Sequence, residues 1–560
     1  MIKDFALLGL SAAFYTIACP PYDWSSAAWV ALTPFLLVIR HKQFFAAVLA
    51  GLTFGVLSCV GIGYWIYITT TQYFSLSLPM GVGLTLLNYV YFAGLYFALA
   101  AGVMSIFLRH PSPVLRAVAI PATWVASELA RTYGVAGIPW ELLGYTQYRH
   151  LPLIQIADLT GVYGISFLLA LSSHAAAETL RALWQRGREK SKITWQKSHG
   201  KIDSLDPRPW TLNSGRRTPD AEPFFSTPDP RPPTPSVFPW PALTLLAVSV
   251  LFTLLYGTLW LYAYRAFSAD DSHSVIITVV QGNIPNAQRW QHTQQASNLL
   301  HYVELTRQGL ANQQPALVIW PEFALGFYLD QEPILRAQIE RFTTALNASF
   351  LVGAPRRNAA TSETQMFNSA YFFSPEGELL STYDKRRLIP LAEYLPPLLA
   401  GLRNRRTEGP NDFTPGTDAT IFSSLDAPFG VVICYEITYP YLVRSLVQGG
   451  AQFLVNLSND VWGAHEGAAA QHFSMTVFRA VEYRRFLVRA ATAGVSGFVD
   501  PTGHAYGLMA GPEGVSTNTV LPRQEMTLYA RYGDWFALLC VTVVFFALLR
   551  VHQQTHEDVA

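Results

Sequence analysis

The chain has 560 residues, which is too long for one ordinary domain. Hydrophobic residues make up 51% of it and charged residues only 14%, a balance that predicts membrane-spanning segments. The net charge of +1 argues against nucleic acid as a partner.

Eight apolar segments predict about eight membrane-spanning helices. They cover residues 5–19, 25–40, 44–69, 79–108, 114–130, 160–180, 241–265 and 533–550. The first two are short and flank a turn, so tilted spans or a re-entrant pair fit them, and we favour spans. We therefore expect helices 1–6 within residues 1–182, helix 7 within 241–266, helix 8 within 531–551 and a tail at 552–560.

Basic connections predict the orientation. Residues 40–42 and 109–116 are rich in Lys and Arg, as is the connection 183–240, whereas the alternate connections are nearly free of them, apart from Arg131 and Arg149. Positive connections stay in the cytoplasm. The segment 267–530 is then expected on the periplasmic side of a bacterial inner membrane.

The connection 183–240 differs in composition from its surroundings. Residues 207–239 include ten prolines. Such a segment buries too little apolar surface to fold, so we expect it to be disordered. A proline motif that binds a partner is the alternative.

The segment 267–530 alternates predicted strands and helices, which indicates an α/β domain. We expect strands at 274–280, 316–320, 350–353, 368–373, 452–456 and 486–489, and helices at 296–310, 333–346 and 466–485. Periodicity alone does not distinguish one α/β layout from another.

Cys434 lies where the apolar run 430–433 gives way to a helical pattern. A helix N-terminus at such a strand-to-helix corner favours a thiolate. The alternative is a small buried cysteine that only packs. The other three cysteines, Cys19, Cys59 and Cys540, lie in apolar runs, so no disulfide framework is expected.

Two further stretches of the sequence favour a catalytic role for Cys434 over simple packing. Glu322 ends the apolar run 316–320, and Lys385 follows a hairpin-like segment. Glu322, Lys385 and Cys434 in this order resemble the nitrilase superfamily, whose members carry Glu, Lys and Cys. The resemblance implies an αββα sandwich of two sheets covered by helices. It also implies supporting roles for Glu393 and Glu436.

The three residue types suit acyl transfer. Glu322 is the candidate general base, provided that burial raises its pKa. Lys385 is the candidate cation that stabilises the thiolate and then the oxyanion, with the backbone N–H of Tyr435 as a second donor. Cys434 is the candidate nucleophile. The alternative for Glu322 and Lys385 is a surface ion pair.

The membrane half carries more specific motifs. Residues 121–128, 137–147, 281–284, 456–460, 471–473 and 529–535 resemble the apolipoprotein N-acyltransferase family. The resemblance implies transfer of an acyl chain from a phospholipid to the α-amino group of a lipoprotein's S-diacylglyceryl cysteine. It implies a multi-pass helical membrane domain with an extracytoplasmic nitrilase-like domain. We expect a monomer with no cofactor and no metal, since no metal-ligand set is evident.

Four residues are candidates for lipid entry. Leu395 and Leu398 lie in a proline-containing but apolar stretch at 394–402, which predicts either a lid that touches lipid or a loop packed on the domain core. Trp140 and Trp462 are the other two, with interface anchoring as their alternative. The chain departs from the family pattern at 461–465 and 491–494, so we expect altered substrate contacts there.

Two other classes of protein are the alternatives. A membrane-anchored amidase or nitrilase acting on another amide or acyl substrate needs only one anchor, and seven spans before the domain argue against it. A transporter with an accessory domain needs charged residues at mid-membrane. Glu128 is the only candidate, and it lies near the end of a predicted span.

Overall fold

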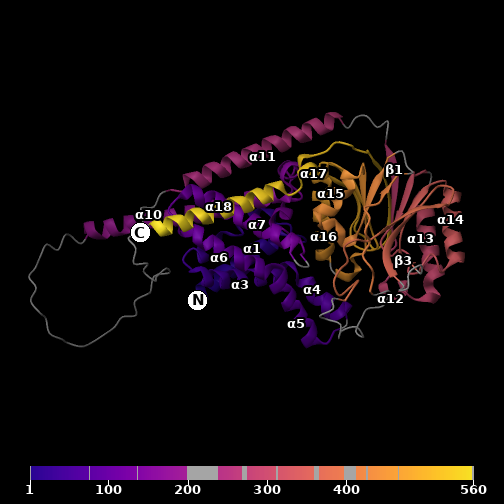
Figure 1. Cartoon of the computed structure of the whole chain (residues 1–560), viewed down its shortest axis with the longest axis horizontal. Coiled ribbons are helices and arrows are strands. Elements are labelled where there is room, and N and C mark those ends of the chain that lie inside the picture. Colours follow the sequence, from indigo (N-terminus) through magenta and orange to yellow (C-terminus); the bar gives the residue numbers. More distant parts are fainter. Residues whose placement is uncertain are drawn as a thin grey trace, which may run out of the picture.

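The protein has a helical half and an α/β half that lie end to end (Figure 1). The computed structural model describes residues 2–74, 76–134, 137–198, 238–267, 274–310, 313–358, 365–395, 412–423, 427–463 and 466–557. The N-terminal helices and the C-terminal helix α18 (Trp535–Glu557) form the first half. The two ends of the chain therefore meet in one helical body.

All eight predicted apolar segments lie on helices. The longer helices of this half are α1 (Ile2–Ala18), α2 (Thr33–Ile39), α3 (Phe44–Ile62), α5 (Leu78–Tyr89), α6 (Leu95–Arg109), α7 (Pro113–Tyr133), α10 (Val162–Ser198), α11 (Trp240–Phe267) and α18. Short turns join them: η1 (Ser25–Val30), α4 (Tyr64–Ile68), η2 (Thr69–Tyr73), η3 (Val90–Gly94), η4 (Leu143–Gln147), α8 (Leu151–Ile154) and α9 (Ala157–Thr160). The turn η3 is a π-helical segment that joins α5 and α6 into one apolar stretch.

Among the described residues, four helices are long and apolar enough to cross a membrane. A fifth is added if the pair on either side of Gly161, bent by 118°, counts as one span. The segments 5–19, 25–40 and 114–130 form shorter or less apolar helices. Helix α7 is less apolar because it contacts α6, α10, α11 and α18 and buries polar groups among them. One of these is Glu128, which accepts hydrogen bonds from the Trp124 indole at 3.0 Å and the Leu143 N–H at 2.8 Å.

Helix α10 is longer than the predicted span. It continues to Ser198, so residues 183–198 are helical, which corrects the expectation of disorder for that part of the connection. The physical reason is local composition, because this stretch is rich in Lys, Arg, Gln and Glu, which favour helix. Residues 199–237, which hold most of the prolines, lie outside the described residues.

The α/β half contains two six-stranded sheets. The first has the order β12-β1-β2-β3-β4-β5 and the second the order β11-β10-β9-β8-β7-β6. The strands are β1 (Val275–Gln281), β2 (Leu317–Trp320), β3 (Ser349–Asn358), β4 (Gln365–Phe373), β5 (Leu379–Asp384), β6 (Ile421–Phe422), β7 (Phe429–Ile433), β8 (Phe453–Ser458), β9 (Phe486–Ala491), β10 (Ser496–Val499), β11 (Ala505–Met509) and β12 (Gly514–Val520).

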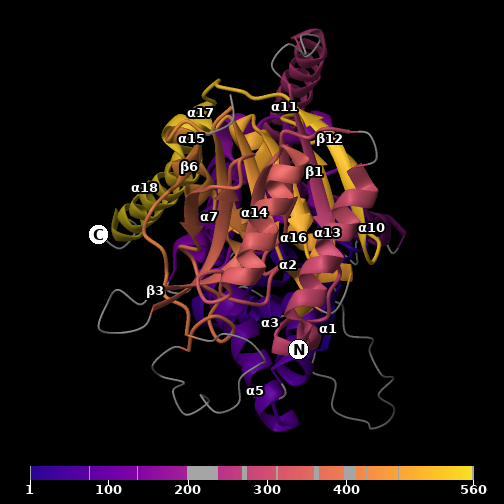
Figure 2. The same cartoon turned by 90° about the vertical axis from the view of Figure 1, so that its right-hand side faces the viewer.

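Helices cover the outer face of each sheet. Helices α13 (Gln295–Leu310) and α14 (Pro333–Leu346) lie on the side away from the membrane half, and α15 (Pro440–Gln448) and α16 (Glu466–Tyr483) lie toward it (Figures 1 and 2). One apolar cluster fills the space between the sheets and another joins the first sheet to α13 and α14. This is the αββα sandwich that the resemblance implied. The short elements α12 (Asn286–Arg289), η5 (His292–Gln294), η7 (Cys434–Thr438), η8 (Asp460–Gly463) and α17 (Leu528–Tyr532) complete the chain.

The helix layer of α15 and α16 shares its core with the membrane helices. Val443 and Leu446 of α15 and Phe478 and Val481 of α16 belong to the same buried cluster as Trp124 of α7. Arg484 adds a polar link, because its guanidinium donates to Asp158 at 2.7 Å and stacks 3.5 Å from the Trp260 ring of α11. The two halves are therefore packed as one body.

Strand direction brings the candidate site residues together. Strands β1, β2 and β3 are mutually parallel, and so are β7, β8 and β9. Glu322 follows the end of β2, Cys434 that of β7 and Asp460 that of β8, and Lys385 follows β5. The carboxyl ends of parallel strands lie at one edge, which is where α/β folds place their sites.

Candidate active site

Cys434 is held in an unusual backbone conformation directly after β7. Its φ is +53°, in the left-handed region that non-glycine residues rarely adopt. Three hydrogen bonds fix the local chain: Asn456 Nδ2 donates to the carbonyl oxygens of Val432 and Cys434, both at 3.3 Å, and His472 Nε2 lies 3.2 Å from the Cys434 carbonyl oxygen. Strained backbone of this kind persists only where its surroundings impose it, and it gathers at active sites.

Glu322 and Lys385 form a buried pair and not a surface one. Lys385 Nζ donates to Glu322 Oε1 at 3.2 Å and to Glu393 Oε1 at 2.9 Å. Lys385 is 1% exposed and Glu322 4%. The surface ion pair weighed as the alternative is therefore wrong.

Asn368, in β4, was missed by the sequence analysis. Its amide donates to Glu322 Oε1 at 2.7 Å and to Glu393 Oε1 at 2.8 Å, so it bridges the two carboxylates. The only available signal was a polar residue within a buried strand pattern. Glu393 Oε2 also accepts from the backbone N–H of Ile389 at 2.8 Å, which fixes its orientation.

The electrostatics of the site favour a neutral thiol at rest. Burial raises the pKa of the Cys434 thiol, the nearby Glu322 carboxylate raises it further, and Lys385 opposes both. The expectation that a helix N-terminus favours the thiolate is thus outweighed. The physical reason is desolvation, and α15 begins only at Pro440, after the short turn η7.

The acid and the cation also have shifted pKa values. Burial raises the pKa of Glu322, against the opposing charge of Lys385. Burial disfavours the charge on Lys385, but Glu322 and Glu393 outweigh it and raise the lysine's pKa above its usual value. The site therefore combines a permanent cation with a carboxylate of increased basicity, as general-base catalysis needs.

Glu436 ties the Cys434 segment to the Lys385 segment. Its carboxylate accepts hydrogen bonds from the Ile433 N–H and the Tyr383 hydroxyl, both at 2.7 Å. It also accepts from the N–H groups of Arg386 and Arg387 at 2.7 and 3.0 Å. One buried acid thus fixes both loops, consistent with the implied supporting role. Tyr435 lies beside it, and its hydroxyl is 2.9 Å from that of Tyr439.

A cavity of about 270 Å³ connects the site to the membrane helices. Glu322, Lys385 and Cys434 all line it at the α/β end. At the other end it is lined mainly by apolar and aromatic side chains of the membrane half. These include Tyr15, Cys59, Ile62, Trp65, Ile66, Phe74, Phe92, Phe97 and Trp140. The cavity crosses the boundary between the two halves.

The four candidates for lipid entry differ in where they lie. Trp140 lines the cavity, and its indole N–H donates to Gln471 Oε1 at 2.8 Å, which also accepts from Trp65 at 3.0 Å. Leu395 is half-buried but does not line the cavity. Leu398 lies outside the described residues, as does the side chain of Trp462. Trp290, which sequence analysis did not select, also lines the cavity.

Arg489, Asp460 and His472 form a buried polar network next to Cys434. Arg489 Nη2 donates to Asp460 Oδ2 at 2.7 Å, and His472 Nδ1 lies 3.0 Å from Asp460 Oδ1. Burial opposes the charge on Asp460, but Arg489 and His472 lower its pKa to about 2. Cys434, Asp460 and His472 offer ligand-type atoms within 4.8 Å of one another. The polar atoms of Asp460 and His472 are engaged in the hydrogen bonds given above.

Thr492, in the stretch 491–494 that differs from the family pattern, contacts the candidate base Glu322. Thr492 Oγ1 donates to the main-chain oxygen of Glu322 at 2.8 Å, and the Thr492 N–H donates to Ser458 O at 2.9 Å. This position therefore contacts the backbone that carries Glu322. In the departure at 461–465, the backbone through Gly463 belongs to η8, and residues 464–465 lie outside the described residues.

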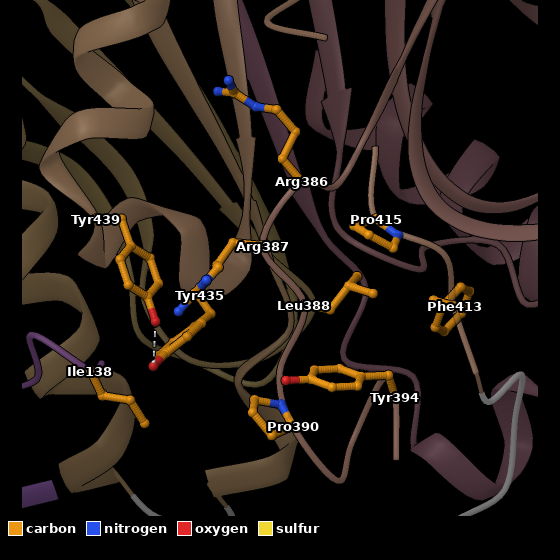
Figure 3. A pocket seen from close by; sticks show the side chains of 10 residues that line it. All are labelled: Ile138, Arg386, Arg387, Leu388, Pro390, Tyr394, Phe413, Pro415, Tyr435 and Tyr439. Atoms are coloured by element: carbon orange, nitrogen blue, oxygen red, sulfur yellow. Dashed lines mark hydrogen bonds between the residues drawn. The ribbon is translucent and has the colours of Figure 1, made fainter. Parts of the chain in front are cut away.

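A second cavity of about 250 Å³ adjoins the first (Figure 3). It shares four lining residues with it: Ile138, Pro390, Phe413 and Tyr435. Arg386 and Arg387 line the second cavity and do not line the first.

Comparisons with known proteins cover nearly the whole chain. Residues 11–175 match the apolipoprotein N-acyltransferase N-terminal domain, and residues 276–531 match the carbon-nitrogen hydrolase family. An apolipoprotein N-acyltransferase of Geobacter metallireducens is 32% identical over 96% of this chain and 93% of the relative. That of Azotobacter vinelandii is 29% identical over 97% and 95%. Among solved structures, an amidase from Nesterenkonia sp. matches 47% of this chain and 94% of its own, at 19% identity and a TM-score of 0.35.

Proposed function

This chain belongs to the apolipoprotein N-acyltransferase family within the nitrilase superfamily, and from that premise we propose its reaction in full. It transfers an acyl chain from a membrane phospholipid to the α-amino group of the S-diacylglyceryl cysteine at the N-terminus of apolipoproteins. The reaction proceeds in two steps through a thioester on Cys434. The cavity that runs from Cys434 into the membrane helices is the observation that supports this most directly. An amidase with a small soluble substrate has no need of such a cavity.

In the first step, Cys434 Sγ attacks the ester carbonyl of the phospholipid while Glu322 takes the thiol proton. The buried thiol is neutral at rest, so this proton must move during the attack. Lys385 and the backbone N–H of Tyr435 stabilise the tetrahedral oxyanion. The ester C–O bond then breaks, the lysophospholipid oxygen takes the proton from Glu322, and the thioester remains.

In the second step, the lipoprotein's amine attacks the thioester carbonyl. Glu322 takes a proton from the attacking nitrogen, the C–S bond breaks, and the released sulfur is reprotonated from Glu322. An amine attacks a phospholipid ester poorly, and the covalent intermediate divides the transfer into two easier steps. The two lipids then need not occupy the cavity together.

We also propose the arrangement in the membrane. About eight spans place residues 267–530 in the periplasm and residues 183–240 and 552–560 in the cytoplasm, in the inner membrane of a bacterium. The C-terminal ends of α10 and α18 lie on the side of the helical half that faces away from the α/β half, which supports this orientation (Figure 1). All groups of the mechanism come from one chain, so we propose a monomer. Trp140 contacts lipid in the cavity, and Leu395, Leu398 and Trp462 are proposed at its entry.

Mass spectrometry of the protein in detergent tests the proposal. Incubation with phospholipid and no acceptor should add one acyl mass to the peptide that contains Cys434, and neutral hydroxylamine should remove it. Addition of an S-diacylglyceryl peptide should then transfer the acyl group to its α-amine. An enzyme that hydrolyses small amides but never acquires the acyl mass would support the amidase alternative.

A further inference from the structure

The second cavity holds a guanidinium group without an acidic partner among the described residues. Arg387 is half-buried, and its guanidinium lies over the ring of Tyr439, at 5.1 Å from the centroid. The groups that act most strongly on its charge are the tyrosines Tyr439, Tyr441 and Tyr435. Figure 3 shows its side chain between Tyr435 and Tyr439, at the wall of the cavity.

Its neighbour Arg386 is different. The Arg386 guanidinium donates to Ser445 Oγ at 3.2 Å and to the Leu442 carbonyl at 3.3 Å, and it points away from Arg387 in Figure 3. Arg386 is therefore committed to α15. Two of the buried arginines in this half, Arg484 and Arg489, are each paired with an aspartate. A half-buried cation without such a partner is the kind of group that an anionic ligand completes.

The position of Arg387 is fixed relative to the nucleophile. Its backbone N–H donates to Glu436 Oε1 at 3.0 Å, and the same carboxylate holds Ile433, the residue before Cys434. Lys385 is two residues earlier in the chain. The cavity of Arg387 opens beside Tyr435, which follows Cys434 and lines both cavities.

We propose that Arg387 binds the phosphodiester of the phospholipid donor and thereby orients its ester toward Cys434, an inference that rests on the proposed function. In a phospholipid, the phosphate and the reacting ester are attached to one glycerol unit, so the phosphate of a donor bound for reaction lies close to the nucleophile. The acceptor's S-diacylglyceryl cysteine has no phosphate. Guanidinium suits this ligand because its planar donors bind two phosphate oxygens at once.

The test compares donors with and without the phosphoglycerol headgroup. Acyl-enzyme formation is followed in single turnovers with phosphatidylglycerol and with diacylglycerol of the same chains, in mixed micelles. Arg387→Ala should slow acylation by phosphatidylglycerol on the order of 10- to 100-fold and leave the diacylglycerol rate nearly unchanged, since a hydrogen-bonded charge is lost. Arg387→Lys should lose less, because it keeps the charge but not the paired donors.

Arg341→Ala is the matched control, because Arg341 is an exposed arginine on α14 whose removal changes the net charge equally. It should leave both donors' rates unchanged. An equal loss of both rates in Arg387→Ala, or no loss in either, would overturn the proposal. Absence of acyl-enzyme in the unmodified protein would instead overturn the proposed function.

Two further arms separate the sources of phosphate. Inorganic phosphate and glycerol 3-phosphate are added to the unmodified protein and to Arg387→Ala. Competition by glycerol 3-phosphate that disappears in Arg387→Ala supports a headgroup site. If only inorganic phosphate competes and the phosphatidylglycerol rate survives in the variant, the site binds free phosphate and the proposal fails. Slowing confined to transfer from preformed acyl-enzyme to the peptide would assign Arg387 to the acceptor and equally overturn it.

Discussion

Lys385 Nζ lies 3.2 Å from Glu322 Oε1, and both side chains are buried. Glu393 places a second carboxylate 2.9 Å from the same ammonium group. With both acids ionised, the cluster has one negative charge in excess. Burial is the main cause that raises the pKa of Glu322 and of Cys434, and Lys385 opposes it at both groups. The Glu393 carboxylate adds to the rise at Glu322 and the Glu322 carboxylate adds to it at Cys434, so the base is strong and the thiol stays protonated until substrate arrives.

The first prediction concerns the three proposed catalytic residues. Cys434→Ala should form no acyl-enzyme, because it lacks the sulfur. Glu322→Gln and Lys385→Met should slow acyl-enzyme formation on the order of 100- to 1000-fold, the usual cost of losing a base or an oxyanion donor. Rapid-quench mass spectrometry measures these rates. A Cys434→Ala protein that acylates lipoprotein normally would show that the nucleophile is another residue.

The second prediction concerns pH. Glu322 acts as a base only when ionised, and its pKa is raised above the usual value of 4.5. The rate of acyl-enzyme formation should therefore fall as the pH is lowered, with a midpoint above 4.5. The residual rate of Glu322→Gln should lack this limb. A pH profile of single turnovers measures both, and an identical acidic limb in the variant would exclude Glu322 as its source.

The third prediction concerns the polar network of Asp460, His472 and Arg489 next to Cys434. The pKa of Asp460 is lowered from 3.8 to about 2, so its ionised form stabilises the fold above pH 3.8 and this contribution is lost as the pH falls toward 2. A shift of that size corresponds to about 2 kcal/mol. Asp460→Asn should lower the free energy of unfolding by about that amount at pH 7.

Denaturation of the detergent-solubilised protein at pH 7 and pH 3 measures this stability. The difference between the unmodified protein and Asp460→Asn should shrink at the lower pH. Asp418→Asn, a change of an exposed aspartate, is the control and should have little effect at either pH. A constant difference at both pH values would contradict an electrostatic role of Asp460.

The fourth prediction concerns topology. A reporter enzyme active only in the periplasm should be active when fused after residue 270 and inactive when fused after residue 215, because the basic connections predict a cytoplasmic location for 183–240. A cytoplasmic reporter should give the opposite pattern at the same two sites. If the two patterns are exchanged, the orientation is inverted.

Much of the fold follows from local patterns in the sequence. The eight apolar runs of the sequence lie on helices, and the predicted helix at 333–346 coincides with α14. Hydrophobic periodicity did not predict the extension of α10 or the role of the polar residues in α7. Residues 183–198 continue α10 because helix-favouring side chains extend the span, and α7 carries buried polar groups that only its neighbouring helices satisfy.

By itself, the sequence determined the order of the elements, the family and the three candidate catalytic residues, because these depend on hydrophobic period and on motifs within short stretches. Only the tertiary structure decided which groups surround them. Asn368 bridges Glu322 and Glu393, and His472 bonds the Cys434 carbonyl, through contacts between residues far apart in the chain. The thiol's raised pKa is likewise a property of the assembled site, since desolvation depends on everything packed around the sulfur.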